Sequence, residues 1–462
     1  MDPMFDPVRF AAATLDVLAS TRASPAALAA RQRARLDRLL SAAMRDSAFY
    51  ASHLPRNLSS ATQLGALPTV SRQVLMENFD DWVTDPHIKL SDLSTFTADL
   101  RRVGDAYLGR YLVWESSGTS NHPGIFVQNV QTLGVYDALE AVRRSPGRPL
   151  QRCVDPMMLT ERFAFVGATS GHFASYVTMQ RLREINPLLA PAVRCFSILQ
   201  CTSALVDALN AFKPTVIATY PTAAAMLADE ADRGCLTCRP REIWSGGETL
   251  SPTVRSRLEH VLACTVRNSY GASEFLPIAW ECGHGCLHVN ADWVILEPVD
   301  EHARAMPAGE LSYTTLLTNL ANPVQPLIRY DLGDQIILHP GNCTCGSSLP
   351  VIEVQGRRDD ALVMAGQHGR TVTLLPLALT TVLEDQAGVF DFQLEQRNDH
   401  TLALRLAVPG PEGEVAAQRC RVALHAFAAV QRLQPIRINV DWGQLIRRGR
   451  SGKAQRIVAK IK

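Results

Sequence analysis

Residues 114–124 read WESSGTSNHPG, and this Ser/Thr/Gly cluster lies between two apolar, strand-like stretches, YLVW at 111–114 and IFVQ at 125–128. Hydroxyl groups and closely approaching backbone N–H groups bind anions without bulk, and glycine allows backbone angles that other residues avoid. A loop of this kind between two strands is therefore typical of a site that wraps a polyphosphate. A solvated turn is the competing interpretation, because the same residue types dominate ordinary turns.

The composition is that of an ordinary globular protein of 462 residues, a length that corresponds to roughly two to four domains. The formal net charge is +1, which gives no basic footprint for nucleic acid or for an anionic membrane surface. The N-terminal stretch MDPMFDPVRFAAATLDVLAS lacks a basic region followed by an apolar run, and no window of the chain is as apolar as a membrane span. We therefore expect a cytoplasmic protein that acts on small molecules, without nucleic-acid or membrane partners.

Strand-like and helix-like runs alternate between about residues 100 and 300. The strand-like runs are FAFVGA at 163–168, TVIATY at 215–220, REIWSGG at 241–247 and VRNSYGA at 266–272. A helix-like run, TAAAMLADEADRG at 222–234, separates two of them. This alternation indicates β-α units on a largely parallel sheet. Residues 24–55 predict packing helices, and residues 310–340 are rich in strand-like runs.

Glycine and charge interrupt the apolar periodicity at VQGRRDDALVMAG, residues 354–366. We place a domain boundary there. The expected fold is α/β, with a large N-terminal domain over residues 1–357 that has mostly parallel sheets and a β-rich subdomain. A small, mobile α+β domain is expected over residues 358–462, with helices at 376–386 and 413–430 and strands in FDFQLEQ, LALRLAV and IRINVDW.

Three further motifs follow strand-like runs, where ligands bind in an α/β sheet. SGGE at 245–248 and NSYGASE at 268–274 offer glycines that let a flat ring or a phosphate approach the backbone, and Glu274 offers a hard oxygen ligand for magnesium. IRYDLGD at 328–334 places a carboxylate in a tight turn, suited to two ribose hydroxyls. A solvated carboxylate and a simple Asp-capped turn are the alternatives.

The order SSGTS, SGGE, YGASE, RYDLGD, GRRDD and a terminal GK resembles the adenylate-forming superfamily of acyl-CoA ligases. The pair TNLANPVQPLIRYDLGD and CTCGSSLPVIEVQGRRDD resembles its phenylacetate-CoA ligase branch most closely. The resemblance implies an adenylating N-terminal domain and binding of ATP and Mg²⁺. The residues that it implies for ATP or AMP are Ser116, Ser117, Gly118, Thr119, Ser120, Gly246, Gly247, Glu248, Tyr270, Gly271, Ala272, Ser273, Asp334 and Arg357.

Within that set, the resemblance implies that the residues from Ser116 to Ser120 hold the β- and γ-phosphates. Thr119 and Glu274 would help to place Mg²⁺, and the residues from Gly246 to Glu248 would line the adenine slot with Tyr270. Asp334 would hold the ribose, Arg357 would contact ribose or phosphate, and Asp359 would be the hinge of the C-terminal domain.

Lys453 is the residue that we expect to carry catalysis in the first half-reaction. A lysine at the forming acyl-phosphate bond neutralises charge on the carboxylate and on the α-phosphate. The surrounding sequence RRGRSGKAQR at 447–456 contains glycines, which suits a loop that enters the site when the C-terminal domain closes. A solvated basic tail is the alternative. The arginines at 447, 448 and 450 suit coenzyme A phosphates or an acidic carrier protein, or they are solvated.

Six Cys and His residues form a candidate metal cluster: Cys282, His284, Cys286, His288, Cys343 and Cys345. Thiolates and imidazoles crowded in this way suit a tetrahedral structural zinc, whereas coincidental reduced thiols without metal are the alternative. Relatives with a C-x-C loop suggest the set Cys282, His288, Cys343 and Cys345. The separate pair Cys235 and Cys238 lacks a partner pair in the sequence nearby, so we interpret it as structural.

The chain departs from the family pattern after its Ser/Thr/Gly run. Many relatives have a lysine there, whereas this chain has Asn121 and His122. His122, Arg101 or Arg102 are the candidate replacements for the missing cation.

The acid-binding pocket is expected at residues 163–175 and 219–223, where His172, Phe173 and Tyr220 are candidate walls for a flat aryl or arylacetic acid. Core packing is the alternative role of these side chains. Those two stretches contain no Arg or Lys, which argues against a dicarboxylate substrate.

The expected activity has two steps. ATP and a carboxylic acid give an acyl-adenylate and pyrophosphate, and the acyl group then passes to coenzyme A, while Lys453 withdraws as the C-terminal domain rotates about Asp359. An amine or a carrier-protein thiol is the alternative acceptor, because the motifs record adenylation and not the acceptor. A homodimer is possible, and an inactive nucleotide-binding module is the alternative of another class.

Overall fold

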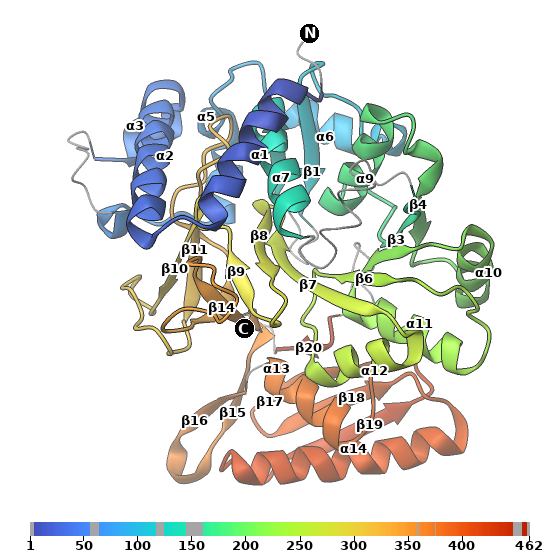
Figure 1. The fold of residues 1–462 in the computed structure, drawn as a ribbon. Helices are drawn as coiled ribbons and strands as arrows, with labels where there is room; N and C mark the ends of the chain where they lie inside the picture. The colour runs from blue at the N-terminus through green and yellow to red at the C-terminus, as the bar shows by residue number, and fades with distance from the viewer. Residues whose placement is uncertain are drawn as a thin grey trace.

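The computed structural model of the protein describes residues 4–55, 64–116, 124–144, 160–357, 360–374, 376–446 and 455–459. Figure 1 shows a large N-terminal part above a smaller C-terminal part, whose helix α14 (Gly410–Val430) runs along the lower edge. Each part has its own buried apolar cluster; the C-terminal one draws on residues from Leu362 to Ile457.

Helices α1 (Pro7–Thr21), α2 (Pro25–Asp46) and α3 (Ala48–His53) form the N-terminal layer, which confirms the helices expected over residues 24–55. Helix α2 begins at Pro25 because the Ser24 hydroxyl accepts a hydrogen bond from the Ala27 N–H, as an N-cap does. Shorter helices follow: α4 (Arg72–Glu77), α5 (Phe79–Trp82) and α6 (Leu90–Ala98). None of the helices in the described ranges has both the length and the apolar character to cross a bilayer.

Nine of the described strands form one sheet in the order β13-β14-β9-β8-β7-β6-β5-β3-β4. Their bounds are β3 (Phe163–Gly167), β4 (Val193–Ser197), β5 (Val216–Thr219), β6 (Glu242–Ser245), β7 (Thr265–Ala272), β8 (Phe275–Glu281), β9 (Leu287–Val289), β13 (Asp334–Leu338) and β14 (Val351–Arg357). From β4 to β7 the pairs are parallel, and from β7 to β13 they are antiparallel. The expected parallel sheet is therefore one half of a mixed sheet, and the expected β-rich subdomain continues it.

The change of direction falls within strand β7. Its first half pairs with β6 in parallel, up to Asn268 opposite Ser245, whereas Ser269 already lies opposite Trp280 of antiparallel β8. The carboxyl ends of β3, β5, β6 and the parallel half of β7 consequently point to one edge of the sheet. Loops that leave these ends converge there, which is the usual location of a ligand site in this class of fold.

Helices cover the parallel half of the sheet: α9 (Ala174–Ile185), α10 (Thr202–Phe212), α11 (Pro221–Asp232) and α12 (Pro252–Leu262), the last three visible on the right of Figure 1. Two smaller antiparallel sheets flank the antiparallel half. They are the hairpin β1 (Tyr111–Glu115) with β2 (Ile125–Asn129), and β10 (Val294–Val299), β11 (Thr314–Asn319) and β12 (Tyr330–Asp331).

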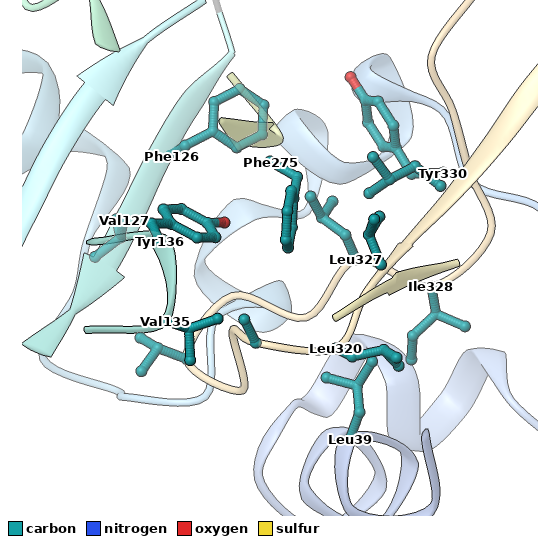
Figure 2. Close-up of a cluster of buried hydrophobic side chains, with 14 of the residues drawn as sticks. Leu39, Phe126, Val127, Val135, Tyr136, Phe275, Leu320, Leu327, Ile328 and Tyr330 are labelled. Atoms are coloured by element: carbon teal, nitrogen blue, oxygen red, sulfur yellow. The ribbon is translucent and has the colours of Figure 1, made fainter. Parts of the chain in front are cut away.

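Helix α7 (Val130–Arg143) joins these layers. Figure 2 shows its Tyr136 beside Phe275 of β8 and near Phe126 of β2; the centroids of the Tyr136 and Phe275 rings are 4.9 Å apart in an edge-on contact. At the end of α7, the guanidinium of Arg143 donates to both carboxylate oxygens of Asp292 at 2.7 and 3.0 Å, and both side chains are fully buried.

The C-terminal part contains the expected α+β elements. The hairpin β15 (Leu362–Ala365) with β16 (Thr371–Leu374) precedes α13 (Pro376–Thr381) and a π-helical turn (Val382–Gln386). A four-stranded sheet in the order β19-β18-β17-β20 packs against α14; its strands are β17 (Phe392–Asn398), β18 (Thr401–Leu406), β19 (Arg437–Trp442) and β20 (Ile457–Val458). The boundary proposed after residue 357 remains a prediction.

We predict that Asp292→Ala lowers the free energy of unfolding by about 3–5 kcal/mol, because it leaves the buried Arg143 charge without its partner. Urea denaturation of the variant and the parent protein measures the difference. The matched control is Asp46→Ala, which breaks an ion pair with Arg45, a side chain that is 71% exposed. The control should leave the unfolding curve unchanged, and similar small shifts for both variants would contradict the prediction.

Candidate active site

A cavity of about 2740 Å³ lies at the carboxyl ends of β3, β5, β6 and β7. The loops that follow these strands line one side of it, and residues of β17, β18 and β20 line another. Most of the motifs that the sequence singled out therefore border a single space between the two parts of the chain.

The neck of the proposed phosphate loop is a closed hairpin. The N–H of Ser116 donates to the carbonyl of Gly124 at 2.7 Å, and the N–H of Gly124 donates to the Ser116 hydroxyl at 2.8 Å. The hairpin pairs Glu115 with Ile125, as expected from the apolar stretches on either side. Ser116 lines the cavity. The other predicted phosphate-loop residues lie outside the described residues: Ser117, Gly118, Thr119, Ser120, Asn121 and His122.

The loop after β6 borders the cavity through Gly246, Gly247 and Glu248. The Glu248 carboxylate accepts hydrogen bonds from the N–H and the hydroxyl of Thr222, at 3.2 and 2.8 Å. Thr222 lies in the first turn of α11, where an acceptor satisfies a backbone N–H that has no partner within the helix. Glu248 thus fixes the position of the glycine loop relative to α11.

The NSYGASE segment turns from β7 into β8 next to that loop. A Cβ atom on Gly271 would lie 1.9 Å from the carbonyl oxygen of Leu276, so only glycine allows the bulged hairpin to close. Tyr270, Gly271, Ala272, Ser273 and Glu274 all line the cavity as a result.

Two tyrosine–carboxylate pairs hold the predicted nucleotide-binding acids. The Tyr270 hydroxyl donates to Asp334 at 2.6 Å, and the Tyr330 hydroxyl donates to Glu274 at 2.7 Å. Burial raises the pKa of Glu274 and raises the pKa of Tyr270 well above its ordinary value. The Glu274 carboxylate lines the cavity beside its tyrosine and suits a hard cation such as Mg²⁺.

The RYDLGD turn places Asp334 opposite Arg357. Gly333 adopts a φ of +72°, in the left-handed region that favours glycine, and Asp334 then begins β13 in register with Arg357 of β14. The Nε of Arg357 lies 3.6 Å from the Asp334 carboxylate, and Nη2 donates to the carbonyl of Leu332 at 3.1 Å. Tyr270, Asp334 and Arg357 therefore form one polar chain along the cavity.

The C-terminal part presents the chain that follows Lys453 to the cavity. Strand β20 pairs with β17 in parallel, and the N–H of Leu394 donates to the carbonyl of Arg456 at 2.7 Å. Gln455 and Arg456 line the cavity, and Gln455 donates to Asp360 at 2.8 Å. Lys453, the hinge residue Asp359, and the arginines at 447, 448 and 450 lie outside the described residues.

The predicted acid-pocket residues divide into two groups. Phe173 and Tyr220 line the cavity, and burial raises the pKa of Tyr220 to about 12, so its hydroxyl stays neutral. His172 does not line it: its side chain is fully buried, with Nε2 3.1 Å from the carbonyl of Asp99. The position of His172 supports the core-packing alternative, because its ring packs beside Phe96.

The candidate cations Arg101 and Arg102 do not line the cavity either. Arg101 binds Asp99 through two hydrogen bonds, and Arg102 lies over the Phe96 ring with its Cζ 4.1 Å from the centroid. Arg72 of α4 lines the cavity instead, and its Cδ would lie 3.3 Å from a Cβ atom on Gly124 at the phosphate-loop neck. No sequence signal distinguished Arg72, because it belongs to a short helix far from the loop in sequence.

Three further residues that the sequence did not indicate line the cavity. They are Glu140 on α7, Arg144 directly after α7, and Trp244 on β6. The argument against a dicarboxylate substrate rests on the lack of Arg and Lys in residues 163–175 and 219–223. Arg144 reaches the same cavity from the end of α7, and the substrate class remains a prediction. The spacing of polar residues along α7 is the sequence signal that could have indicated a polar face on this helix.

The four metal candidates that relatives suggested lie together: Cys282, His288, Cys343 and Cys345, with ligand atoms within 4.8 Å of one another. The Cys282 and Cys343 sulfurs are 3.9 Å apart, and the Cys345 sulfur is 3.3 Å from Nε2 of His288. Thiolates at zinc–sulfur bond length around a tetrahedral ion lie about 3.8 Å apart. Nδ1 of His288 lies 2.9 Å from the carbonyl of Leu349, which leaves Nε2 as the ligand atom. The residues therefore fit zinc.

Comparison with known proteins agrees with this geometry. Residues 188–307 match the family model of the AMP-binding enzymes. The phenylacetate-coenzyme A ligase of Thermus thermophilus is 28% identical over 193 residues, which are 39% of this chain and 42% of that protein. A phenylacetate-coenzyme A ligase of Pseudomonas putida is 26% identical over 36% of this chain and 39% of that protein. The matched stretches thus span less than half of these relatives.

The fold is similar over a much longer stretch. The crystal structure of 2-hydroxyisobutyryl-CoA ligase in the postadenylation state has a TM-score of 0.70 at 18% identity, covering 99% of this chain and 93% of that chain. A benzoate CoA ligase from Burkholderia xenovorans LB400 has a TM-score of 0.52 at 18% identity, over 76% of this chain and 69% of that chain. The chain therefore shares the fold of these CoA ligases, matches the AMP-binding enzymes over residues 188–307, and is similar over part of its length to phenylacetate-coenzyme A ligases.

Proposed function

We propose that the protein activates a carboxylic acid with ATP, forming an acyl-adenylate and pyrophosphate, and then transfers the acyl group to coenzyme A. The observation that carries the proposal is the convergence of two tyrosine-held carboxylates, Asp334 and Glu274, with the phosphate-loop neck at Ser116 on one cavity. An adenylation site requires a ribose-binding acid, a metal-binding acid and an anion-binding loop side by side. The similarity to phenylacetate-coenzyme A ligases supports coenzyme A as the acceptor.

The nucleotide would lie along the polar chain of Tyr270, Asp334 and Arg357. Asp334 would accept the ribose hydroxyls, and the glycine loop from Gly246 to Glu248 would border the adenine. Glu274, with Thr119 of the phosphate loop, would hold Mg²⁺, which neutralises phosphate charge when bound. The acid would lie beyond Tyr270, toward the cavity walls of Phe173 and Tyr220.

We further infer that Arg72 supplies the cation that the phosphate loop lacks. Arg72 lines the cavity next to Gly124, at the neck that the phosphate loop closes. Its charge also acts on Tyr330, whose hydroxyl holds Glu274, so it lies on the metal side of the nucleotide site. A guanidinium in this position would stabilise the departing pyrophosphate.

We also propose that the Cys282, His288, Cys343 and Cys345 cluster binds a structural zinc. Its ligands come from the turn after β8, from strand β9 and from the loop between β13 and β14, so a bound ion would fix the antiparallel half of the sheet. That half carries Asp334 and Arg357 into the cavity. Zinc would therefore stabilise the nucleotide side of the site without contacting it.

Exchange of labelled pyrophosphate into ATP, dependent on added carboxylic acid, tests the first step. We expect Lys453→Ala to abolish this exchange while the variant still converts supplied acyl-adenylate and coenzyme A to the thioester, because the lysine acts only on the forming acyl-phosphate bond. Lys89→Ala, a change at a surface lysine paired with Asp80, is the control and should retain both activities. Equal loss of both steps in the Lys453 variant would contradict the alternation of the C-terminal domain. Amide formation with an amine in place of coenzyme A, with release of AMP, would reassign the second step.

We expect Arg72→Ala to reduce pyrophosphate exchange by about 100-fold, the scale of removing one donor that stabilises a transition-state charge. Arg72→Lys should recover part of the rate, because it keeps the positive charge. Steady-state exchange rates at saturating ATP measure both. Unchanged exchange in Arg72→Ala would assign the missing cation to another residue.

We expect Cys343→Ser to lower both the bound zinc and the melting temperature, since loss of one thiolate leaves an incomplete tetrahedral set. Elemental analysis of the purified protein and a thermal melt measure the two effects. Cys235→Ser, at an exposed cysteine outside the cluster, is the matched control and should change neither. A parent protein without zinc would remove the metal proposal while leaving the adenylation proposal intact.

A further inference from the structure

Helix α7 turns a polar face toward the cavity. Asp137, Glu140, Ala141 and Arg144 line the cavity, and their spacing of three and four residues places them along one side of the helix and its C-terminal end. Asp137 is bound by the buried Arg181, whose Nη1 and Nη2 donate to it at 3.0 and 2.9 Å. Glu140 and Arg144 form an ion pair with each other instead.

The pair is closed but accessible from the cavity. Nε of Arg144 lies 2.5 Å from one carboxylate oxygen of Glu140, and Nη2 donates to the other at 3.0 Å. The side chains retain 24% and 38% exposure, and both line the cavity, so the exposed atoms face that space. Burial raises the pKa of Glu140, and the Arg144 guanidinium opposes this shift.

Two contacts place Arg144 at the end of β6, beside Trp244, whose strand partner Ala218 lies two residues before the proposed acid wall Tyr220. Nη2 of Arg144 donates to the Ser269 hydroxyl at 3.3 Å, and that hydroxyl donates to the carbonyl of Ser245 at 3.1 Å. Ser269 directly precedes Tyr270, the first member of the polar chain that would hold the nucleotide. The Arg144 guanidinium therefore contacts the residue that precedes Tyr270 in the chain.

The facing wall is aromatic. The Arg144 guanidinium lies over the Trp244 ring with its Cζ 5.0 Å from the centroid, and Trp244 packs against Phe163 at 5.5 Å between ring centroids. Phe163, Phe165 and Trp244 all line the cavity. The cavity here therefore has an apolar wall suited to a flat ring, with the charged pair at the edge of that wall.

An unsubstituted aryl acid would cover the Glu140–Arg144 pair without replacing the water that solvates it, and covering charges in this way costs free energy. A hydroxyl or amino group on the ring would donate to the Glu140 carboxylate or accept from Arg144. A second full charge is disfavoured, because the pair is neutral as a whole and each member already holds its counter-charge.

We propose that the Glu140–Arg144 pair is a specificity determinant that selects an aromatic acid bearing a hydroxyl or amino group at the end remote from its carboxylate. The inference rests on the proposed adenylation and names the substrate class of that site. Ser269 and Trp244 act as positioning residues for the Arg144 guanidinium, since one accepts its hydrogen bond and the other lies under its plane.

The test compares matched acids in acid-dependent pyrophosphate exchange: phenylacetic with hydroxyphenylacetic acid, and benzoic with aminobenzoic acid. We expect the parent protein to prefer the substituted acid of a pair in kcat/KM by at least about 10-fold. The double variant Glu140→Leu with Arg144→Met leaves no unpaired charge and should reverse the preference, with the KM for ATP unchanged. A melting temperature for each variant shows that it is folded.

The second variant, Arg144→Lys, keeps the charge and should retain the parent preference in weakened form. A preference that is absent in the parent, or that is the same within twofold in the double variant, would overturn the inference. If no acid supports exchange, the adenylation proposal fails by itself. Calorimetric binding of the same acids to the parent and to the double variant then decides whether the pair still discriminates between them.

Discussion

The site depends on a single constraint, the change of pairing direction within β7. Because β6 ends at Ser245, opposite Asn268, strand β7 continues beyond its parallel neighbour, pairs with β8 from Ser269 onward and then turns into β8. Gly271 makes this turn possible, since a side chain there would collide with the Leu276 carbonyl. The turn carries Tyr270 and Glu274 to the edge at which β3, β5 and β6 end. The other groups of the proposed site reach that edge from other elements of the fold.

The antiparallel half of the sheet then supplies the partners of these two residues. Tyr270 holds Asp334 and Tyr330 holds Glu274, so each pair joins β7 or the turn after it to a residue beyond position 328. Phenol–carboxylate hydrogen bonds stabilise ionised acids in a partly buried place, where an acid without donors would become protonated. The same contacts hold both oxygen donors in place relative to each other, as metal and ribose binding require.

The C-terminal part meets the cavity through few but well-defined contacts. Glu384 of the π-helical turn is buried, accepts from the hydroxyl of Ser251 at the start of α12, and pairs with Arg456 at 2.6 Å. This link joins the N-terminal part, the π-helical turn and the segment after Lys453 in one cluster. At this point the two parts of the chain are joined by a buried carboxylate that bonds a hydroxyl on one side and a guanidinium on the other.

The sequence by itself determined the local elements and their order. Strand-like runs followed by SGGE, NSYGASE and RYDLGD predicted where chain turns and glycines lie, because turn chemistry and strand periodicity act over a few residues. The tertiary structure decided which side chains meet. It brought Arg72, Glu140 and Arg144 to the cavity, buried His172 beside Phe96, and placed four of six Cys and His candidates within ligand distance. These outcomes depend on how distant elements pack, and no pattern within a single segment records the direction from which another segment approaches it.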